Sequence, residues 1–343
     1  MAIFTSNKVL TENVNLPEVG EIMPTMEASD QILYEFAEDM YKINAALYVS
    51  DVIIEQSVME GAENPEALLE NVVGDFFKKI VEAFKKLWAK IKAWFKEVIK
   101  TLEVQFMSGE KFIKKYKKEL EDKKATGFNY KGYKYDVAKM EKSIDDVAKK
   151  ASGYTNTDLG NLDKITKEDL EKRLGDVAQL SGSEFVEKVF GKAITDIKAD
   201  ITRDLRGNID KELELKDFEG NSKSEMISFV EGFKKCIEAV KKDAAEADKN
   251  LSNCIKKIES AGKSYKGEET GITGVVSTVA TNLKACISVA QNMYSLKQQA
   301  YKEVYRQYVH ILKKYLTFKP AKESAVETGT GAKSILESAM DLI

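Results

Sequence analysis

The stretch Phe76–Lys100, FFKKIVEAFKKLWAKIKAWFKEVIK, carries an aromatic or aliphatic residue at every third or fourth position. This spacing predicts a helix with one broad apolar face. Lysines fill the opposite face and the edges, where their stems cover apolar surface while the ammonium groups stay in water. The pattern is compatible with a core helix of a lysine-rich bundle, a helix on a membrane surface or a helix that binds nucleic acid. We favour the bundle, because an amphipathic helix in a globular chain usually faces a core.

The distribution of charge around this stretch supports the same interpretation. The chain has 343 residues and a net charge of −3, yet residues 1–75 contain 15 acidic and two basic residues. Residues 76–124 contain 15 lysines and seven acidic residues. A helical hairpin formed by residues 29–60 and 65–100 would place the carboxylates beside the lysines. We therefore expect these two segments to dock against each other.

Capping residues predict the bounds of the two helices. Ser29 is a candidate N-cap of the first helix, and Gly61 is its candidate end. The pair Asn64-Pro65 is a stronger start signal, because proline suits the first position of a helix. The second helix can continue to Lys124, and a break near Ser108-Gly109 stays open.

The period changes after this helical region. In TGFNYKGYKY, residues 126–135, aromatic residues alternate around Lys131-Gly132, which predicts a short β-hairpin or an aromatic turn. A short helix and then SGYTNTDLGNLD follow, and the whole segment 126–165 is predicted to be a hairpin and loop insertion. Capping boxes then open helices at 167–180 and 182–206, through the pairs Thr166 with Asp169 and Ser181 with Glu184.

The C-terminal half has the longest helical patterns. A charged connector, residues 206–221, precedes helices at 222–262 and 273–318, which predict a long antiparallel hairpin with arms of ~60 Å. We therefore expect an all-α protein, an elongated helical bundle with this hairpin and the short β-hairpin or aromatic turn. Its predicted parts are an extended N-terminal arm (1–28), an acidic and basic helical region (29–125), the insertion (126–165), a helical bundle (166–320) and a flexible tail (321–343).

Residues that carry chemistry are scarce. His310 is the only histidine, and the three cysteines, Cys236, Cys254 and Cys286, lie among small apolar residues at helical spacing, which predicts buried packing. Nucleotide-binding, hydrolase and zinc-protease motifs are missing. We therefore expect no enzyme, no cofactor and no metal. The N-terminus lacks a secretory signal and no window is apolar enough to span a membrane, the nearest being residues 271–290.

Aromatic residues supply the candidate interaction sites. We expect Phe84, Trp88, Trp94 and Phe95 to be buried or partner-facing anchors. The tyrosines of the last long helix form either a partner-binding stripe or the wet edge of the hairpin; they are Tyr294, Tyr301, Tyr305, Tyr308 and Tyr315. The basic run 111–124 lacks arginine and reads as a solvated helix face rather than a phosphate site.

Two features resemble virion proteins of large tailed bacteriophages. FKKLWAKIKAWFKEVIK, KFIKKYKKEL and FNYKGYKYDV, over residues 60–140, are similar in style to uncharacterised proteins of such particles. The tetrad Ile335-Leu336-Glu337-Ser338 resembles the sites cut by their head-maturation proteases. Related tetrads place further candidate processing sites at Glu27, Glu60 and Glu327. The resemblance implies a non-enzymatic component of the virion, assembled in the host cytoplasm with other virion proteins, and an internal head protein is one form of it.

Two other functions stay open on the sequence. The first is a membrane-active helical protein of the pore-forming type, with residues 76–100 or 271–290 as the concealed amphipathic element. The second is nucleic-acid packaging through residues 76–124, which would depend steeply on salt.

Overall fold

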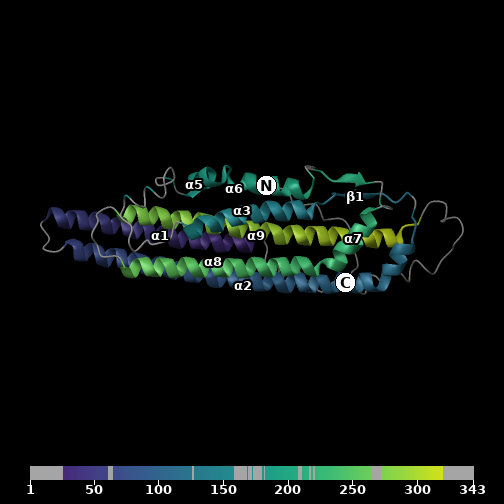
Figure 1. Cartoon of the computed structure of the whole chain (residues 1–343), viewed down its shortest axis with the longest axis horizontal. Coiled ribbons are helices and arrows are strands. Elements are labelled where there is room, and N and C mark those ends of the chain that lie inside the picture. The colour runs from purple at the N-terminus through teal and green to yellow at the C-terminus, as the bar shows by residue number, and fades with distance from the viewer. Residues whose placement is uncertain are drawn as a thin grey trace.

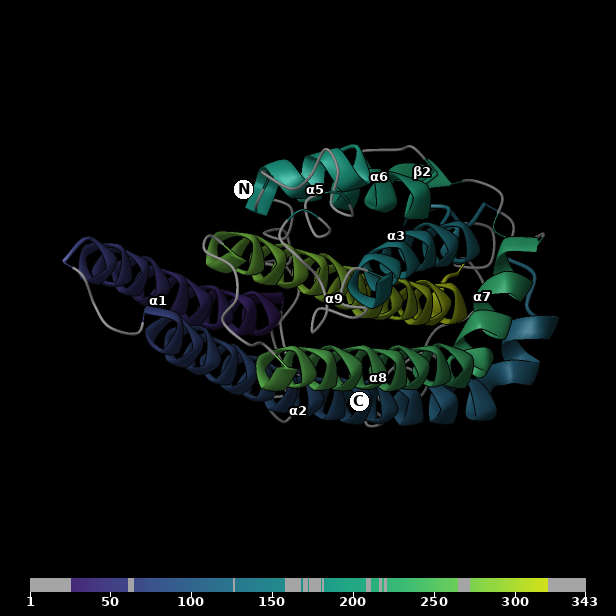
Figure 2. The ribbon, with the colours of Figure 1, turned by 60° about the vertical axis from the view of Figure 1, so that its left-hand side comes forward.

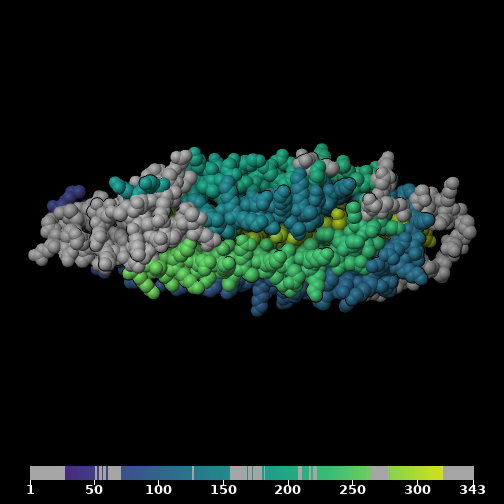
Figure 3. Space-filling model, viewed as in Figure 1, coloured from purple at the N-terminus to yellow at the C-terminus, as the bar shows by residue number. Residues whose placement is uncertain are grey.

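The computed structural model confirms an all-α fold, since helices make up most of the residues that it describes. These residues are 26–60, 65–125, 127–157, 168, 172, 180, 182–207, 211–215, 218, 221–264 and 272–319. The helices lie side by side along one long axis, and the space-filling view has the same elongated outline (Figures 1 and 3). They are α1 (Met26–Met59), α2 (Pro65–Asp122), α3 (Val137–Thr157), α5 (Gly182–Phe190), α6 (Ile194–Leu205), α7 (Asn221–Gly232), α8 (Lys234–Ser264) and α9 (Ile272–Thr317).

Helices α1 and α2 pack against each other along the first half of α2, and α1 also contacts α9 (Figure 2). The ring of Phe36 meets that of Phe84 edge to face, with centroids 5.1 Å apart. Ion pairs of the expected kind join the two helices: Glu35 pairs with Lys90, and another pair joins Asp39 to Lys86 at 3.8 Å. The acidic helix therefore does lie beside the basic one.

The start of α1 differs from the prediction. The helix begins at Met26, so Ser29 is inside it rather than at its N-cap. Ser29 is fully buried, and its hydroxyl accepts a hydrogen bond from the Gln291 side chain of α9 at 3.2 Å. A serine at this position is explained by a buried polar contact between two helices, which the local sequence does not show.

Helix α2 runs for 58 residues without a break, a length of ~87 Å. Gly109 lies inside this helix, so the possible break near Ser108-Gly109 does not occur. A β-carbon on Gly109 would collide with the phenol of Tyr305 from α9. The glycine is therefore needed for a close side-chain approach and not for a turn.

The predicted β-hairpin around Lys131-Gly132 is wrong. Both residues lie inside a strand, β1 (Tyr130–Gly132), which pairs antiparallel with β2 (Leu213–Leu215). The register joins Tyr130 to Leu215, so the partner strand comes from the charged connector. Alternation of aromatic residues indicated a strand correctly, but a local pattern does not identify a partner that is 85 residues away.

An aromatic cluster secures this end of the molecule. The ring of Phe128 lies within 5.1–6.4 Å, centroid to centroid, of four others; they are Tyr130, Phe218, Tyr315 and Phe318. The sheet is therefore anchored to the C-terminal end of α9 by apolar contacts.

The middle segment is also divided differently. Helix α3 continues to Thr157, through SGYTNT of the predicted loop. The predicted helix 182–206 is two helices, α5 and α6, because Gly191 between them has a φ of +79° and ends α5. Most of the predicted helix 167–180, and with it Thr166 and Asp169, lies outside the described residues.

The last long helices run in opposite directions (Figure 2). The first predicted arm, 222–262, is divided at Phe233 into α7 and α8. Helix α8 packs mainly against α2, whereas α9 packs mainly against α3 and α1. The predicted tail 321–343 lies outside the described residues.

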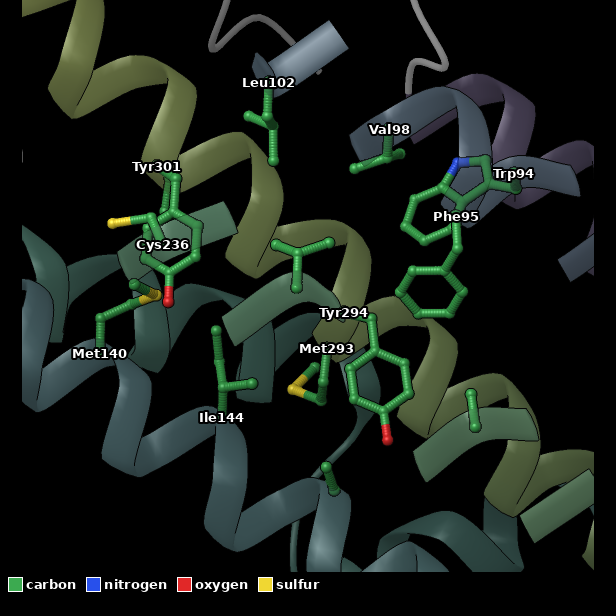
Figure 4. Packing of buried hydrophobic residues seen from close by; sticks show 14 of the residues in the cluster. Trp94, Phe95, Val98, Leu102, Met140, Ile144, Cys236, Met293, Tyr294 and Tyr301 are labelled. Carbon is green, nitrogen blue, oxygen red and sulfur yellow. The ribbon is translucent and has the colours of Figure 1, made fainter. Parts of the chain in front are cut away.

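The core lies where α2, α3, α8 and α9 meet. Figure 4 shows side chains from these four helices pointing toward one another; among them are Trp94, Phe95, Val98, Leu102, Met140, Ile144, Cys236, Met293, Tyr294 and Tyr301. Helix α9 contributes to this core from the middle of the molecule, with contacts to α1, α2, α3 and α7.

Candidate interaction surfaces

Three of the four predicted anchors on α2 are buried. Phe84, Trp94 and Phe95 are at most 4% exposed. The rings of Trp94 and Phe95 meet edge to face with centroids 4.9 Å apart, and the ring of Phe95 also contacts that of Tyr294 in α9, with centroids 5.7 Å apart (Figure 4). These aromatic side chains therefore contact other helices of the same chain and are not available to a partner.

Trp88 is the exception, because it is only partly buried. Its indole nitrogen donates a hydrogen bond to Asp248 of α8 at 2.8 Å, and Lys92 lies 4.2 Å from the ring centroid. Lys92 also pairs with Asp248 at 2.7 Å, which lowers the pKa of that carboxyl through hydrogen bonds from Lys92 and Trp88. This small cluster joins α2 to α8 at the surface.

Trp88 is also at one end of an open groove between α2 and α8. The groove has a volume of about 610 Å³ and is lined by Trp88, Ile91, Lys92, Phe95, Lys96, Ile99, Lys100, Glu103, Ala244, Ala245 and Asp248. Apolar and small side chains from both helices form its floor. We call it the α2–α8 groove.

Positive charge predominates on the rim of the α2–α8 groove. Glu103 and Asp248 are the acidic residues there, and each forms an ion pair, Glu103 with Lys241 and Asp248 with Lys92. Lys96 and Lys100 are exposed and form no ion pair with any described residue. The groove therefore combines an apolar floor with two available cations.

A second surface lies on α1, on the side away from the core. Its large apolar residues are exposed; they are Tyr34 (66%), Tyr41 (75%), Tyr48 (73%), Val52 (38%) and Met59 (82%). The three tyrosines are spaced by seven residues, which keeps them on one face of a helix. We call this set the α1 outer stripe. The charged side chains in line with it, as far as the structure describes them, are the acidic Asp30 and Glu38.

The sequence predictions did not include the α1 outer stripe. They concentrated on the face of this helix that carries Phe36 and Met40, both of which are buried. The seven-residue spacing of Tyr34, Tyr41 and Tyr48 was a visible signal, because a helix that faces a core on one side seldom repeats a large apolar residue on the other.

The tyrosines of α9 are neither a partner-binding stripe nor a wet edge. Tyr294, Tyr301, Tyr305 and Tyr315 are buried and Tyr308 is partly buried, because α9 is surrounded by other helices. Tyr301 donates a hydrogen bond to Glu141. The pKa of Tyr301 is raised, mainly by burial and to a smaller extent by the carboxylate of Glu141. The hydroxyl of Tyr301 therefore stays protonated and acts as a donor within the core.

A buried ionic cluster accompanies them. Lys297 of α9 lies 3.1 Å from Asp145 of α3 and 3.2 Å from Asp243 of α8. Burial raises the pKa of Asp243 to about 6, against the opposing effect of Lys297. Burial alone would lower the pKa of Lys297, but the two carboxylates more than offset it and raise that pKa. The cluster links three helices across the core.

The remaining titratable groups give little support to catalysis. All three cysteines are free and buried, as predicted, and burial raises the pKa of Cys236 and that of Cys254 to about 12. Their thiols are therefore poor nucleophiles at neutral pH. His310 is exposed on α9. Across the described ranges, no three His, Cys, Asp or Glu side chains are grouped closely enough to hold a metal ion.

Many lysines of residues 76–124 are paired with carboxylates of other helices. Lys85 pairs with Glu259 and Lys117 with Glu231, in addition to the pairs already described. In the basic run 111–124, Lys123 donates hydrogen bonds to the carbonyl oxygens of Leu316 and Phe318 and thereby caps the end of α9. These contacts reduce the positive charge available to nucleic acid.

The candidate processing sites fall in different surroundings. Glu27 is in the first turn of α1, and Glu60 is exposed directly after the helix. Glu327 and Glu337 lie outside the described residues.

Comparison with models of known families, with curated proteins and with solved structures finds no match to this chain. Within the part of the chain that the structure describes, none of the helices has the length and apolar character needed to cross a membrane. The α2–α8 groove and the α1 outer stripe are the candidate interaction surfaces of the described residues.

Proposed function

We propose that this protein is a non-enzymatic structural component of a bacteriophage virion, in the form of an internal head protein, and acts through protein–protein contacts with other virion proteins. The observation that carries the proposal is the α1 outer stripe, a row of large apolar side chains that the chain itself leaves exposed. Exposed apolar rows of this length on a folded chain are typical of interaction sites. A structural role needs such a contact surface and no reactive site.

The elongated helical bundle supports the same role. Helix α2 alone is ~87 Å long, so the chain offers continuous edges along which other proteins can pack. Its aromatic face is closed by α1, α8 and α9. The contacts with partners are therefore assigned to the outer surfaces rather than to Phe84, Trp94 or Phe95.

The assignment to a virion is supported by the resemblance of residues 60–140 and of the tetrad at Glu337 to proteins of large tailed phages. A test compares the intact mass and the solution size of the protein from its native source with those of the recombinant chain. Recovery in purified particles, in a form shortened at Glu27, Glu60, Glu327 or Glu337, would support the proposal. Absence of the chain from particles would refute it.

The membrane-active alternative is favoured by one observation, the concealment of an amphipathic helix. The apolar face of α2 is covered by α1, and the charged contacts between them are exposed ion pairs, which are weak. Leakage of a dye from lipid vesicles at physiological salt separates the two functions. A virion component leaves the vesicles intact, whereas a pore-forming protein releases the dye.

A further inference from the structure

We propose that copies of this chain assemble head to tail, with the α1 outer stripe of one molecule in the α2–α8 groove of the next. The inference rests on the proposed structural role and names the partner, a second copy of the chain. Its basis is that the two exposed surfaces complement each other in shape, polarity and charge.

Shape and size agree. The stripe is a ridge of tyrosines on one helix, and the groove is a depression between two helices with the small residues Ala244 and Ala245 on the α8 side. From Tyr34 to Tyr48 the helix rises ~21 Å, and the α2 wall of the groove from Trp88 to Glu103 rises ~22 Å. Packing of a helical ridge into a groove between helices is a common mode of association.

The polarity of the two surfaces also agrees. On the floor of the groove, Ile99 and the indole of Trp88 are partly exposed. Ile91 and Phe95 also line the groove but are buried in the core of the chain itself. Three tyrosine rings would bring large apolar area to this floor while their hydroxyls stay near its polar rim. Tyrosine is one of the residues enriched at protein interfaces for this reason.

Charge decides between occupants. Asp30 and Glu38 are aligned with the tyrosines, whereas Lys96 and Lys100, on the rim of the groove, form no ion pair within the part of the chain that the structure describes. Two α1 outer stripes that face each other would bring like-charged carboxylates together. On an anionic membrane, the same carboxylates would be repelled by the lipid headgroups. Placing the stripe in the groove instead pairs opposite charges, which favours this arrangement and fixes its orientation. Glu38 is paired with Lys42 only through an exposed contact within one helix, so it can exchange partners.

The contact is heterologous, because two different patches of the same molecule meet. In a pair of molecules, the one that contributes its stripe still has a free groove, and the one that contributes its groove still has a free stripe. Further copies can therefore add, and the assembly is a ring or a filament rather than a closed dimer. This is the kind of assembly that a repeated particle component requires.

The test uses sedimentation velocity of the full chain at about 100 μM, where even a small interface is populated. Wild-type protein is expected to form oligomers that grow with concentration and shrink as salt is raised. Tyr41→Glu places a charge in the middle of the apolar stripe, and Lys96→Glu reverses one charge on the rim of the groove. Each variant is therefore expected to be monomeric. An equimolar mixture of the two retains one intact stripe and one intact groove and is expected to yield a dimer.

Two control variants change exposed residues outside both surfaces. Met107→Glu introduces the same charge at an exposed apolar position of α2, and Lys111→Glu reverses an exposed lysine. Both are expected to oligomerise like wild type. Circular dichroism checks that each variant is folded, and Lys100→Glu replaces Lys96→Glu if the latter is not.

Three results would overturn the inference: a monomeric wild-type chain, oligomers that survive both Tyr41→Glu and Lys96→Glu, or a mixture of these variants that stays monomeric. Binding of a different protein to the stripe of a monomeric chain would also count against it. Particle composition is measured separately. A chain found in particles but monomeric in solution refutes only the head-to-tail contact, whereas a self-assembling chain absent from particles refutes only the virion role.

Discussion

The side chain of Tyr305 lies directly against the backbone of α2 at Gly109, and its hydroxyl donates a hydrogen bond to the carbonyl oxygen of Phe106 at 3.2 Å. Helix α9 can approach α2 this closely only because position 109 has no side chain. The contact makes a glycine inside a 58-residue helix a packing requirement.

Gly109→Ala should therefore destabilise the protein although alanine favours helices. The methyl group would displace the buried Tyr305 ring, at a cost of about 2 kcal/mol. Gly74→Ala is the matched control on the same helix, since a β-carbon there meets no other atom within 4 Å. This control should stabilise by about 0.5–1 kcal/mol. Urea unfolding measures both, and equal effects of the two substitutions would contradict the role of Tyr305.

Phe84→Ala should be among the most damaging substitutions in the chain. Phe84 is fully buried between α1 and α2, so its removal leaves a cavity and should cost about 3–5 kcal/mol. Tyr34→Ala, on the exposed side of α1, should change the stability by less than about 0.5 kcal/mol. The midpoint of thermal unfolding distinguishes the two. A mild effect of Phe84→Ala would show that α1 does not cover α2.

Lys297→Met should destabilise the protein at neutral pH, because it leaves the buried carboxylate of Asp243 without its cation. The expected cost is about 3 kcal/mol. In the double variant Asp243→Asn, Lys297→Met, no charge remains at either position, so most of the loss should be recovered. Denaturant unfolding of the wild type, both single variants and the double variant gives the coupling between the two residues. A coupling close to zero would mean that the pair contributes nothing.

The pH dependence of stability should show the raised pKa of Asp243. Its pKa is about 6 in the folded chain and 3.8 in its ordinary state, so between these values the folded chain binds a proton that the unfolded chain has lost. The contribution of Asp243 to the free energy of unfolding must then decrease as pH rises from about 4 to 6, by roughly 3 kcal/mol at most. The difference between wild type and Asp243→Asn, measured over this range, isolates the contribution. A flat difference would disprove the raised pKa.

Removal of residues 1–60 should expose the apolar face of α2. The loss of α1 uncovers Phe84 and leaves Lys86 and Lys90 without their α1 carboxylates. The truncated protein should aggregate or bind anionic vesicles, which light scattering and vesicle flotation would detect. A truncated protein that stays monomeric and ignores vesicles would show that α1 is dispensable as a cover.

Local patterns accounted for much of the helical structure. The three- and four-residue spacing of apolar residues over 76–100 was sufficient to locate a buried face, which includes Phe84, Trp94 and Phe95. Asn64-Pro65 marks the start of α2 as the helix chemistry predicts. Such features depend on neighbours within a few turns, so a single sequence shows them.

Features that depend on distant residues could not be predicted in this way. Strand β1 pairs with β2, which lies more than 80 residues further along the chain. Position 109 needs a glycine because Tyr305, almost 200 residues further along, packs against it. The burial of the α9 tyrosines likewise follows from the central place of α9, which periodicity does not encode. For the candidate sites, the groove needs α2 and α8 together, whereas the α1 outer stripe could have been found from its tyrosine spacing alone.

The pairing of α1 with α2 has a consequence for the order of events during protein synthesis. The other helices that cover the aromatic face of α2, α8 and α9, are made more than 100 residues after it, whereas α1 precedes it directly. Contacts between neighbouring segments close early, and exposed apolar surface on an incomplete chain invites aggregation. We expect α1 to shield the nascent chain until α8 emerges from the ribosome. Nascent chains stalled before α8 should then bind chaperones more strongly when they carry Phe36→Glu.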